Sequence, residues 1–332
     1  MRFSPVISLA RRLSFRLPSH HADAGKLRLA SVLTLEAGLY LSAAVGIAYV
    51  AGFATVDATL DKVNWPWLVA CLAFVPVAFL GYYRAYRPVF RLKNCTLDLD
   101  RKSRLAVVAA GFGGFLDHGG GALDRVALEG AGASERDAKV RATMLSGLEH
   151  GVLAVPCLIA ASVLVGLGGS TPGASFTVPW IVGPVVGAAI GFWAIKRFRP
   201  GGRLSIPFAA GRMLLTMFSR PRTNVLPLGG MLLFWLSDMV ILWCAMAGFG
   251  FKMNVGATVI AFGTAMIVTR RNGPLGGVGV LDLALPPTLW VCGAHWGPAV
   301  LGTFAYRFFT LWLPLPVALT GLPRLRALIE RA

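Results

Sequence analysis

Charged residues are scarce in this sequence, and acidic residues are the scarcest. Only 14% of the 332 residues are charged, with 15 Asp and Glu against 32 Lys and Arg, whereas a soluble domain has roughly 25% charged residues. The sequence also lacks the ~10-residue segments of alternating apolar and polar positions that mark a membrane β-barrel. With 56% hydrophobic residues, the composition predicts an all-α polytopic membrane protein.

Motifs for metal ions, disulfides and nucleotides are also lacking. The five cysteines form no C-x-x-C pair, and four lie in apolar runs, which is typical of small core residues. Asp117-His118 and Glu149-His150 have no third ligand at a suitable spacing. The glycine runs match neither G-x-G-x-x-G nor a P-loop, and no nucleophile elbow is present. We therefore expect no metal site and no cofactor.

The net charge of +17 is concentrated in short segments between apolar runs. This distribution follows the positive-inside rule for membrane proteins and argues against a nucleic-acid partner. Most of the basic residues are arginines, which suit contact with anionic lipid phosphates. We expect a multi-pass protein of the cell membrane with both termini in the cytoplasm.

Apolar runs close to the ~20 residues of a spanning helix predict a single transmembrane domain over residues 29–320. Spans are expected at 31–53, 65–83, 148–168, 178–195, 225–249, 255–269, 280–293 and 297–319. The glycine-rich segment 105–121 is short for a span, and we interpret it as re-entrant. These assignments predict about eight crossings with one or two re-entrant or broken segments.

Basic segments frame this domain. Residues 1–28 and 321–332 are predicted cytoplasmic tails, and a basic, amphipathic linker, 201–222, joins two halves, 29–200 and 223–320. The charged stretch 134–147 is predicted on the inner face. Glu36 lies near the start of the first span, which indicates an interfacial position.

The stretch 270–282 (RRNGPLGGVGVLD) interrupts the apolar sequence with two arginines, four glycines, a proline and a carboxylate. A backbone broken at membrane depth is tolerated only where it is buried in protein or lines a wet cavity. Charges at that depth are costly and tend to be functional. This stretch therefore predicts half of a site for an anionic lipid headgroup.

A similar pattern occurs in the first half. Residues 119–128 (GGGALDRVAL) and 276–285 (GGVGVLDLAL) share a glycine run, Leu-Asp and Ala-Leu. Glycine-interrupted segments at corresponding positions of two halves indicate the central site of a transporter. The match predicts an inverted repeat, with segment 111–125 facing the 270–282 stretch.

The candidate site residues follow from these patterns. The predicted headgroup-binding residues are Arg125, Arg270, Arg271, Arg307, Gly276, Gly277 and Gly279, because guanidinium groups bind phosphate in a bidentate manner and glycine permits close backbone approach. Arg270 and Arg271 would otherwise be ordinary positive-inside anchors. Asp124, Asp238 and Asp282 are predicted to partner arginines or carry protons, or alternatively to form pairs that only hold helices together.

These residues resemble the lysylphosphatidylglycerol synthase transmembrane (flippase) family. The family's late motif, Pro-Gly-Gly-x-Gly-x-x-Glu followed by a span with an Arg and an aromatic-Leu-Pro end, is matched by Pro274, Gly276, Gly277, Gly279, Asp282, Arg307 and Trp312-Leu313-Pro314, with Leu275 inserted after Pro274 and Asp282 replacing the Glu. The early motif is matched by Gly121, Asp124 and Arg125, without its Asn and Pro. The likeness covers most of residues 30–320. It implies a helical protein with re-entrant segments that moves a lipid between leaflets.

We therefore predict a stand-alone lipid flippase, without the soluble aminoacyl-transferase domain, rather than an enzyme. Its expected partner is an anionic, aminoacylated or polyprenyl-phosphate lipid. One alternative is a membrane enzyme acting on a polyprenyl-phosphate or phospholipid, with Asp117, His118 and Asp124 as its acid–base cluster. Another is a non-catalytic membrane partner of a separate lipid-modifying enzyme. A second copy of the chain is a further candidate partner.

Overall fold

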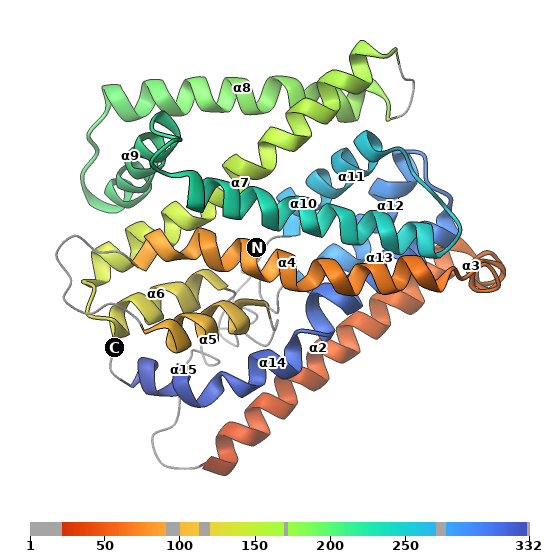
Figure 1. The fold of residues 1–332 in the computed structure, drawn as a ribbon, viewed down its shortest axis with the longest axis horizontal. Coiled ribbons are helices and arrows are strands. Elements are labelled where there is room, and N and C mark those ends of the chain that lie inside the picture. Colours follow the sequence, from red (N-terminus) through yellow and green to blue (C-terminus); the bar gives the residue numbers. More distant parts are fainter. Residues whose placement is uncertain (1–21, 91–99, 113–119, 169–171, 270–276, 331–332) are drawn as a thin grey trace, which may run out of the picture.

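The structure is a computed structural model that describes residues 22–90, 100–112, 120–168, 172–269 and 277–330. Regular structure in these ranges is entirely helical. The elements are α2 (Ala22–Ala51), α3 (Phe53–Leu60), α4 (Trp65–Phe90), α5 (Arg101–Phe112), α6 (Gly120–Gly130), α7 (Glu135–Gly166), α8 (Ala174–Arg197), a 3-10 turn (Gly202–Leu204), α9 (Ser205–Ser219), α10 (Val225–Gly248), α11 (Val255–Thr269), α12 (Val280–Val291), α13 (Trp296–Arg307), a π-helical turn (Phe308–Trp312), α14 (Leu315–Thr320) and α15 (Leu322–Ile329). Figure 1 shows their arrangement.

Within the described ranges, six segments are long and apolar enough to cross a membrane: Leu29–Ala51, Trp65–Tyr86, Glu135–Gly166, Ala174–Arg197, Val225–Gly248 and Trp296–Thr320. Two shorter apolar helices, Val255–Ile267 and Val280–Val291, accompany them. Many large apolar side chains on the outer faces are exposed, most of all on α8. A water-soluble protein would bury such a surface. The chain is an all-α, membrane-embedded protein.

Two of the differences between the helices and the sequence prediction concern the long spans. The charged stretch 134–147 and the third span form one continuous helix, α7, because no break separates them and the Ser134 hydroxyl accepts the Asp137 N–H at the start (3.2 Å). The final span is not one helix. It consists of α13, the π-helical turn and α14, because Leu313 N–H reaches back to the Phe308 carbonyl (2.8 Å).

Helices α4 and α10 form the centre of the molecule (Figure 1). They run antiparallel, since the Asn64 N–H before α4 donates to the Gly248 carbonyl at the end of α10 (2.7 Å). At Gly81 and Gly230 the two backbones nearly touch. A Cβ on Gly81 would lie 2.7 Å from the Gly230 carbonyl oxygen, and a Cβ on Gly230 would lie 2.6 Å from the Gly81 carbonyl oxygen.

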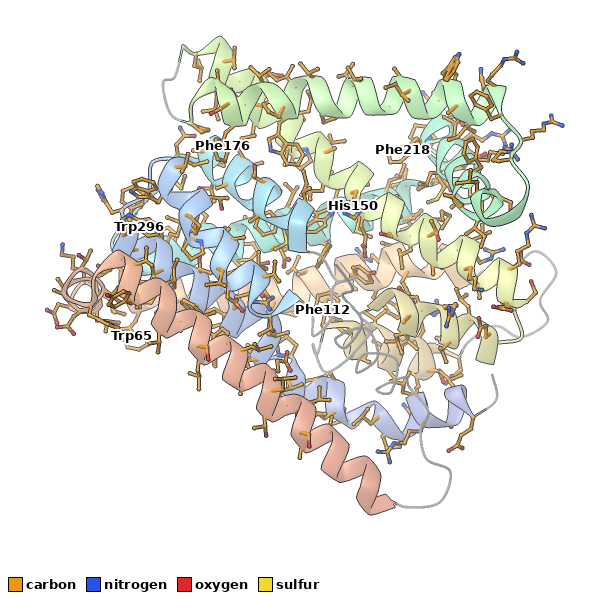
Figure 2. The ribbon with its side chains drawn as sticks, turned by 180° about the vertical axis from the view of Figure 1, so that it is seen from behind. Trp65, Phe112, His150, Phe176, Phe218 and Trp296 are labelled. Atoms are coloured by element: carbon orange, nitrogen blue, oxygen red, sulfur yellow. The ribbon has the colours of Figure 1, made fainter. Side chains whose placement is uncertain are left out.

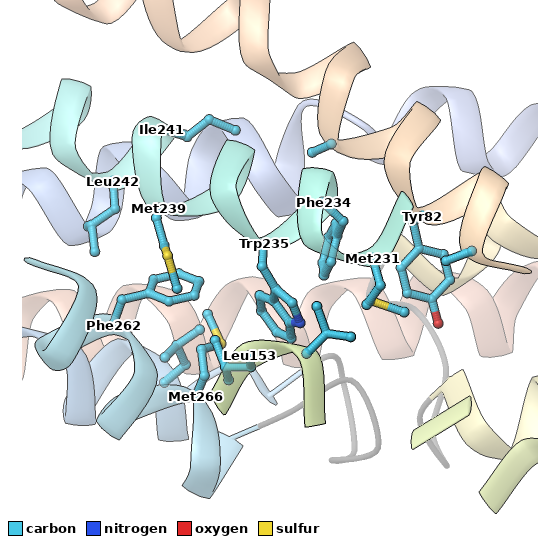
Figure 3. Close-up of a cluster of buried hydrophobic side chains, with 14 of the residues drawn as sticks. Tyr82, Leu153, Met231, Phe234, Trp235, Met239, Ile241, Leu242, Phe262 and Met266 are labelled. Atoms are coloured by element: carbon cyan, nitrogen blue, oxygen red, sulfur yellow. The ribbon is translucent and has the colours of Figure 1, made fainter. Parts of the chain in front are cut away.

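This glycine contact is reciprocal. The Gly81 position also abuts the Phe234 amide nitrogen, four residues after Gly230, and the Gly230 position abuts the Ala85 amide nitrogen, four residues after Gly81. Contacts of this kind arise when two elements are related by a two-fold axis. Beside this contact, α10 buries a row of large side chains that includes Met231, Phe234, Trp235, Met239 and Leu242 (Figure 3).

One helix–turn–helix unit also occurs twice. Gly132 (φ 90°) ends α6 and Gly293 (φ 102°) ends α12, a conformation that glycine adopts without strain. The hydrogen-bond pairs Gly132 N–Glu129 O and Ala133 N–Leu128 O recur as Gly293 N–Trp290 O and Ala294 N–Leu289 O. The α6–α7 and α12–α13 connections therefore share the same backbone hydrogen bonds and the same glycine conformation.

Aligning the two turns pairs different residues of the two halves from those that the Leu-Asp motif pairs. With Gly132 placed on Gly293, Asp124 falls opposite Leu285 and Asp282 falls opposite Gly121. The two aspartates thus differ by nearly one helical turn in register. Their similar sequence surroundings do not make them equivalent positions.

The C-terminal segment is packed rather than extended away from the bundle. Helix α15 lies against α5 and α6, with Leu325 and Leu328 buried. A Cβ on Gly130 would overlap the Leu328 carbonyl, so glycine is needed for this approach. At the opposite end of the molecule, Trp65 and Trp296 lie together at one edge in Figure 2.

Candidate functional site

The start of α12 holds a fully buried carboxylate. Gly277 (φ 75°) and Gly279 (φ 81°) adopt backbone conformations that favour glycine, and α12 begins directly after them. The Gly279 N–H donates to Asp282 Oδ2 (2.9 Å), so this side chain caps the first turn of its own helix. The positive end of the α12 dipole also stabilises this negative charge.

Arg307, at the end of α13, binds the same carboxylate. Its Nε donates to Asp282 Oδ1 at 2.9 Å, and the arginine side chain is 6% exposed. The π-helical turn follows at once, and Thr310 donates its hydroxyl to the Tyr306 carbonyl (2.9 Å). Turns of this kind are frequent at functional sites. The ion pair therefore lies between the start of α12, which follows two glycines with positive φ, and the π-helical turn that follows α13.

Tyr306, the residue before Arg307, contacts a second carboxylate, and that carboxylate lines a cavity. Its hydroxyl donates to Asp238 Oδ2 on α10 at 3.2 Å, with both groups buried. Asp238 lines a cavity of about 390 Å³ whose walls come from α4, α5, α10, the π-helical turn and α14. Apart from Asp238 and Thr310, the lining side chains are apolar, among them Phe79, Phe112 and Val317. A cavity of this size falls in the range of ligand sites.

Two residues of α2 complete the surroundings of the ion pair. Glu36 is 1% exposed, and its carboxylate interacts electrostatically with both Arg307 and Asp282. Tyr40, one turn later, donates its hydroxyl to the Phe304 carbonyl (2.9 Å) and packs its ring against Phe304 and Trp312. The Glu36 side chain is buried within the protein, where α2 packs on α12 and α13. Its interfacial depth in the membrane stays a prediction.

A second buried cluster surrounds Asp124. The Tyr86 hydroxyl donates to Asp124 Oδ1, and the Tyr82 hydroxyl donates to Glu149 Oε1 (2.6 Å). Trp235 from α10 donates its Nε1–H to the Glu149 carbonyl (2.9 Å). Tyr82 and Trp235 lie along the same buried surface of the bundle in Figure 3. These acidic side chains of α6 and α7 are thus bound by tyrosines of α4, and the backbone of α7 is bound by Trp235 of α10.

The remaining predicted residues divide into two groups. Arg125 lies on α6 with its side chain 44% exposed, and its Nε approaches Glu129 Oε1 on the same helix at 3.6 Å. Its ion pair therefore stays within α6, while the neighbouring Asp124 points into the bundle. Arg270, Arg271, Gly276 and the pair Asp117-His118 lie outside the described residues. Within the described ranges, no three His, Cys, Asp or Glu side chains gather as metal ligands.

Several polar residues of these clusters are not among those predicted from the sequence. Tyr82, Tyr86, Tyr306 and Tyr40 each donate a hydroxyl to a group distant in sequence. Such pairings depend on tertiary contacts that no local pattern reveals. For Glu36 a signal was present, because it is the single charged residue between Leu29 and Ala51, and isolated charges inside spans are functional candidates.

Neither the protein-family models nor the curated protein sequences contain a match to this chain.

Proposed function

We propose that this chain is a lipid flippase that moves an anionic or phosphate-bearing lipid, aminoacylated and polyprenyl lipids included, between the leaflets of the cell membrane. One observation carries the proposal. The Asp282–Arg307 ion pair lies buried between a glycine-broken helix start and a π-helical turn, inside an apolar helical bundle. Maintaining such a pair in a membrane protein is costly, and intramembrane charges mark the paths of ions and polar substrates.

The neighbouring groups suit the two parts of a lipid. Arg307 carries a planar guanidinium fork that matches phosphate, and its Nε–H donates to Asp282. The N–H groups at the start of α12 add a favourable field for an anion. The cavity beside Asp238 is largely apolar and accommodates part of an acyl chain. Tyr306 links the two regions through Asp238.

The antiparallel α4–α10 pair supports a transport mechanism. The reciprocal Gly81–Gly230 contact and the repeated turns at Gly132 and Gly293 fit an inverted repeat. In transporters of that architecture, one half rocks against the other around a site between them. We propose that the α4–α10 contact is the axis of such a motion.

Reconstitution into vesicles tests the proposal. The exchange of labelled anionic lipids between leaflets is compared for the parent protein, Arg307→Ala, Arg307→Lys and Arg270→Ala. We expect about a hundredfold slower exchange for Arg307→Ala, since losing a hydrogen bond between charged groups costs about 1.5–3 kcal/mol. Arg307→Lys, which keeps the charge but loses the fork, is expected to be intermediate. If Arg307→Ala and Arg270→Ala both match the parent, the proposed site is wrong.

Stability must be separated from transport, because Arg307→Ala leaves Asp282 as an unpaired buried charge. That change alone costs about 3–5 kcal/mol. The double variant Asp282→Leu/Arg307→Met removes both charges, and we expect it to recover most of the thermal stability but not the lipid exchange. Arg212→Ala on α9, an arginine that contacts the Phe198 carbonyl, is the control for loss of a positive charge away from the site.

A further inference from the structure

Glu36 is a buried carboxyl group with an unusual environment. Its side chain is 1% exposed, and neither of its oxygens has a hydrogen-bond partner among the described residues. It is also the single charged residue between Leu29 and Ala51. Buried polar atoms in proteins nearly always have a partner, so an exception requires an explanation.

The groups that face Glu36 come from the two helices packed on α2. Among the described residues, the charged groups that interact with it electrostatically are Arg307 on α13 and Asp282 on α12. Tyr40, on α2 itself, directs its hydroxyl to the Phe304 carbonyl and not to Glu36. Arg307 donates its Nε to Asp282 at 2.9 Å, so two acidic side chains share the field of one guanidinium group.

Charge balance in this cluster decides the state of Glu36. With Asp282 ionised and paired to Arg307, the pair is neutral. A second ionised carboxylate without a hydrogen bond would be a net buried charge, which costs far more than a protonated, neutral carboxyl group. Glu36 in the described arrangement is therefore the carboxyl group that holds a proton.

We propose that Glu36 is a proton-binding site that competes with Asp282 for Arg307. When Glu36 loses its proton to water, its new carboxylate attracts the guanidinium group and weakens the Asp282–Arg307 pair. When it regains a proton from water, Arg307 returns to Asp282. Each exchange adds or removes one proton, and no other bond forms or breaks. The link from this exchange to lipid movement rests on the proposed function, whereas the proton site itself does not.

Infrared difference spectroscopy tests the proton site directly. The C=O stretch of protonated carboxyl groups is recorded for the purified protein in lipid while the pH is raised, with H/D exchange to identify the band. We expect one band to be present in the parent and in Glu135→Gln, and absent in Glu36→Gln. Glu135 is the matched control because it is an exposed carboxylate that pairs with Lys139. Spectra of Glu36→Gln that equal the parent at every pH would overturn the proposal.

Two further measurements keep the test decisive. Glu36→Asp keeps a titratable group, and we expect it to retain the band with a shifted midpoint. If Glu36→Gln does not fold, a folded Glu36→Asp without any protonated-carboxyl band contradicts the proposal. Loss of the parent band on adding sodium at constant pH would assign the site to a metal cation instead.

The coupling is tested separately in vesicles. We expect the parent's lipid exchange to change at least tenfold across the pH range in which the Glu36 band disappears. Glu36→Gln should exchange lipid at a rate independent of pH. If the band behaves as expected but the parent moves no lipid, the proton site stands and the proposed function fails.

Discussion

At the scale of single residues, the buried polar groups of this protein are arranged as tyrosine–carboxylate and arginine–carboxylate contacts. Tyr86, Tyr82 and Tyr306 each donate to an acidic side chain, and Arg307 donates to Asp282. In a low-dielectric interior such bonds are strong, and a missing partner is costly. These contacts determine where the acidic side chains lie relative to α4 and α13, which supply the donors.

The Tyr82→Phe variant tests how much one of these hydrogen bonds contributes to stability. The substitution removes the hydroxyl that donates to Glu149 Oε1 at 2.6 Å, both groups being buried. We expect the free energy of unfolding to fall by about 1–3 kcal/mol, because a buried acceptor loses its donor. The measurement is thermal unfolding in detergent. Tyr49→Phe, whose ring is 75% exposed, is the control and should leave the midpoint unchanged.

Some of this residue-scale picture was predictable. Arg307 and Asp282 stand out as charges in apolar sequence, and the structure brings them together. The separate behaviour of Arg125 was not predictable, because adjacent residues on a helix point in different directions, and the burial of Asp124 places Arg125 on the outer side of α6. The tyrosine partners and the enclosure of Glu36 depend on helix packing between distant segments.

At the scale of helices, the most extensive contact is the one between α4 and α10, where Gly81 meets Gly230. Without a hydrophobic driving force between helices in lipid, small residues allow the close approach that stabilises their association. We expect Gly81→Ala and Gly230→Ala each to lower stability by about 1–3 kcal/mol through overpacking. Thermal unfolding in detergent checks this, and the double variant should lose less than the sum because the two sites share one contact.

The matched control lies on α8. Gly187 has no atom within 4 Å of the position where a Cβ would stand. Gly187→Ala should therefore be neutral, or slightly stabilising through helix propensity. If Gly81→Ala were as well tolerated as Gly187→Ala, the α4–α10 backbones would not be in close contact.

The N-terminus of α5 provides a pH-dependent test. Hydrogen bonding from Ser103 lowers the pKa of the Asp100 carboxyl, which caps this helix by accepting the Ser103 N–H (3.2 Å). Because folding lowers this pKa, the stabilisation is present above the unfolded pKa and is lost as the pH falls through the folded pKa. We expect Asp100→Ala to cost about 1 kcal/mol at neutral pH and less in acid.

Ser134→Ala, which removes the uncharged cap of α7, should instead cost a similar amount at every pH. Unfolding midpoints of both variants measured across the acidic range would separate the two cases. An Asp100→Ala effect that stays constant with pH would contradict the role of the charge.

Helix positions were largely predictable because apolar length and composition set them directly. The predicted spans at 225–249 and 255–269 coincide closely with α10 and α11. The register of the repeat was not predictable, since the Leu-Asp match and the hydrogen-bonded turns at Gly132 and Gly293 give different alignments. Glycine runs tolerate slippage in a sequence comparison, whereas a turn that requires positive φ fixes the register.

At the scale of the whole molecule, helices from both halves of the chain pack across the α4–α10 contact (Figure 1). The linker helix α9 also packs on α7 of the first half. We expect polypeptides 1–200 and 201–332, expressed together from separate reading frames, to associate and co-purify. Gly230→Leu in the second polypeptide should strongly reduce the recovery of the first. Equal recovery with and without Gly230→Leu would show that the α4–α10 contact does not hold the halves together.

The overall class was predictable from composition alone, because scarce charge and long apolar runs permit few other solutions. Which helices become neighbours was not. The pairing of α4 with α10 depends on two glycines, far apart in sequence, meeting face to face. Nothing local distinguishes Gly81 or Gly230 from glycines such as Gly187, which touch nothing.

The position of α4 and α10 in the chain has a consequence for biogenesis. During synthesis α4 enters the membrane before α10 has been made. The face of α4 that carries Gly81 therefore stays exposed to lipid until α5 to α9 have been synthesised. A nascent chain in that state exposes the surface that later forms its most extensive helix contact, and unpaired surfaces of this kind favour misassembly. Maturation of this protein is therefore expected to depend on the synthesis of α10.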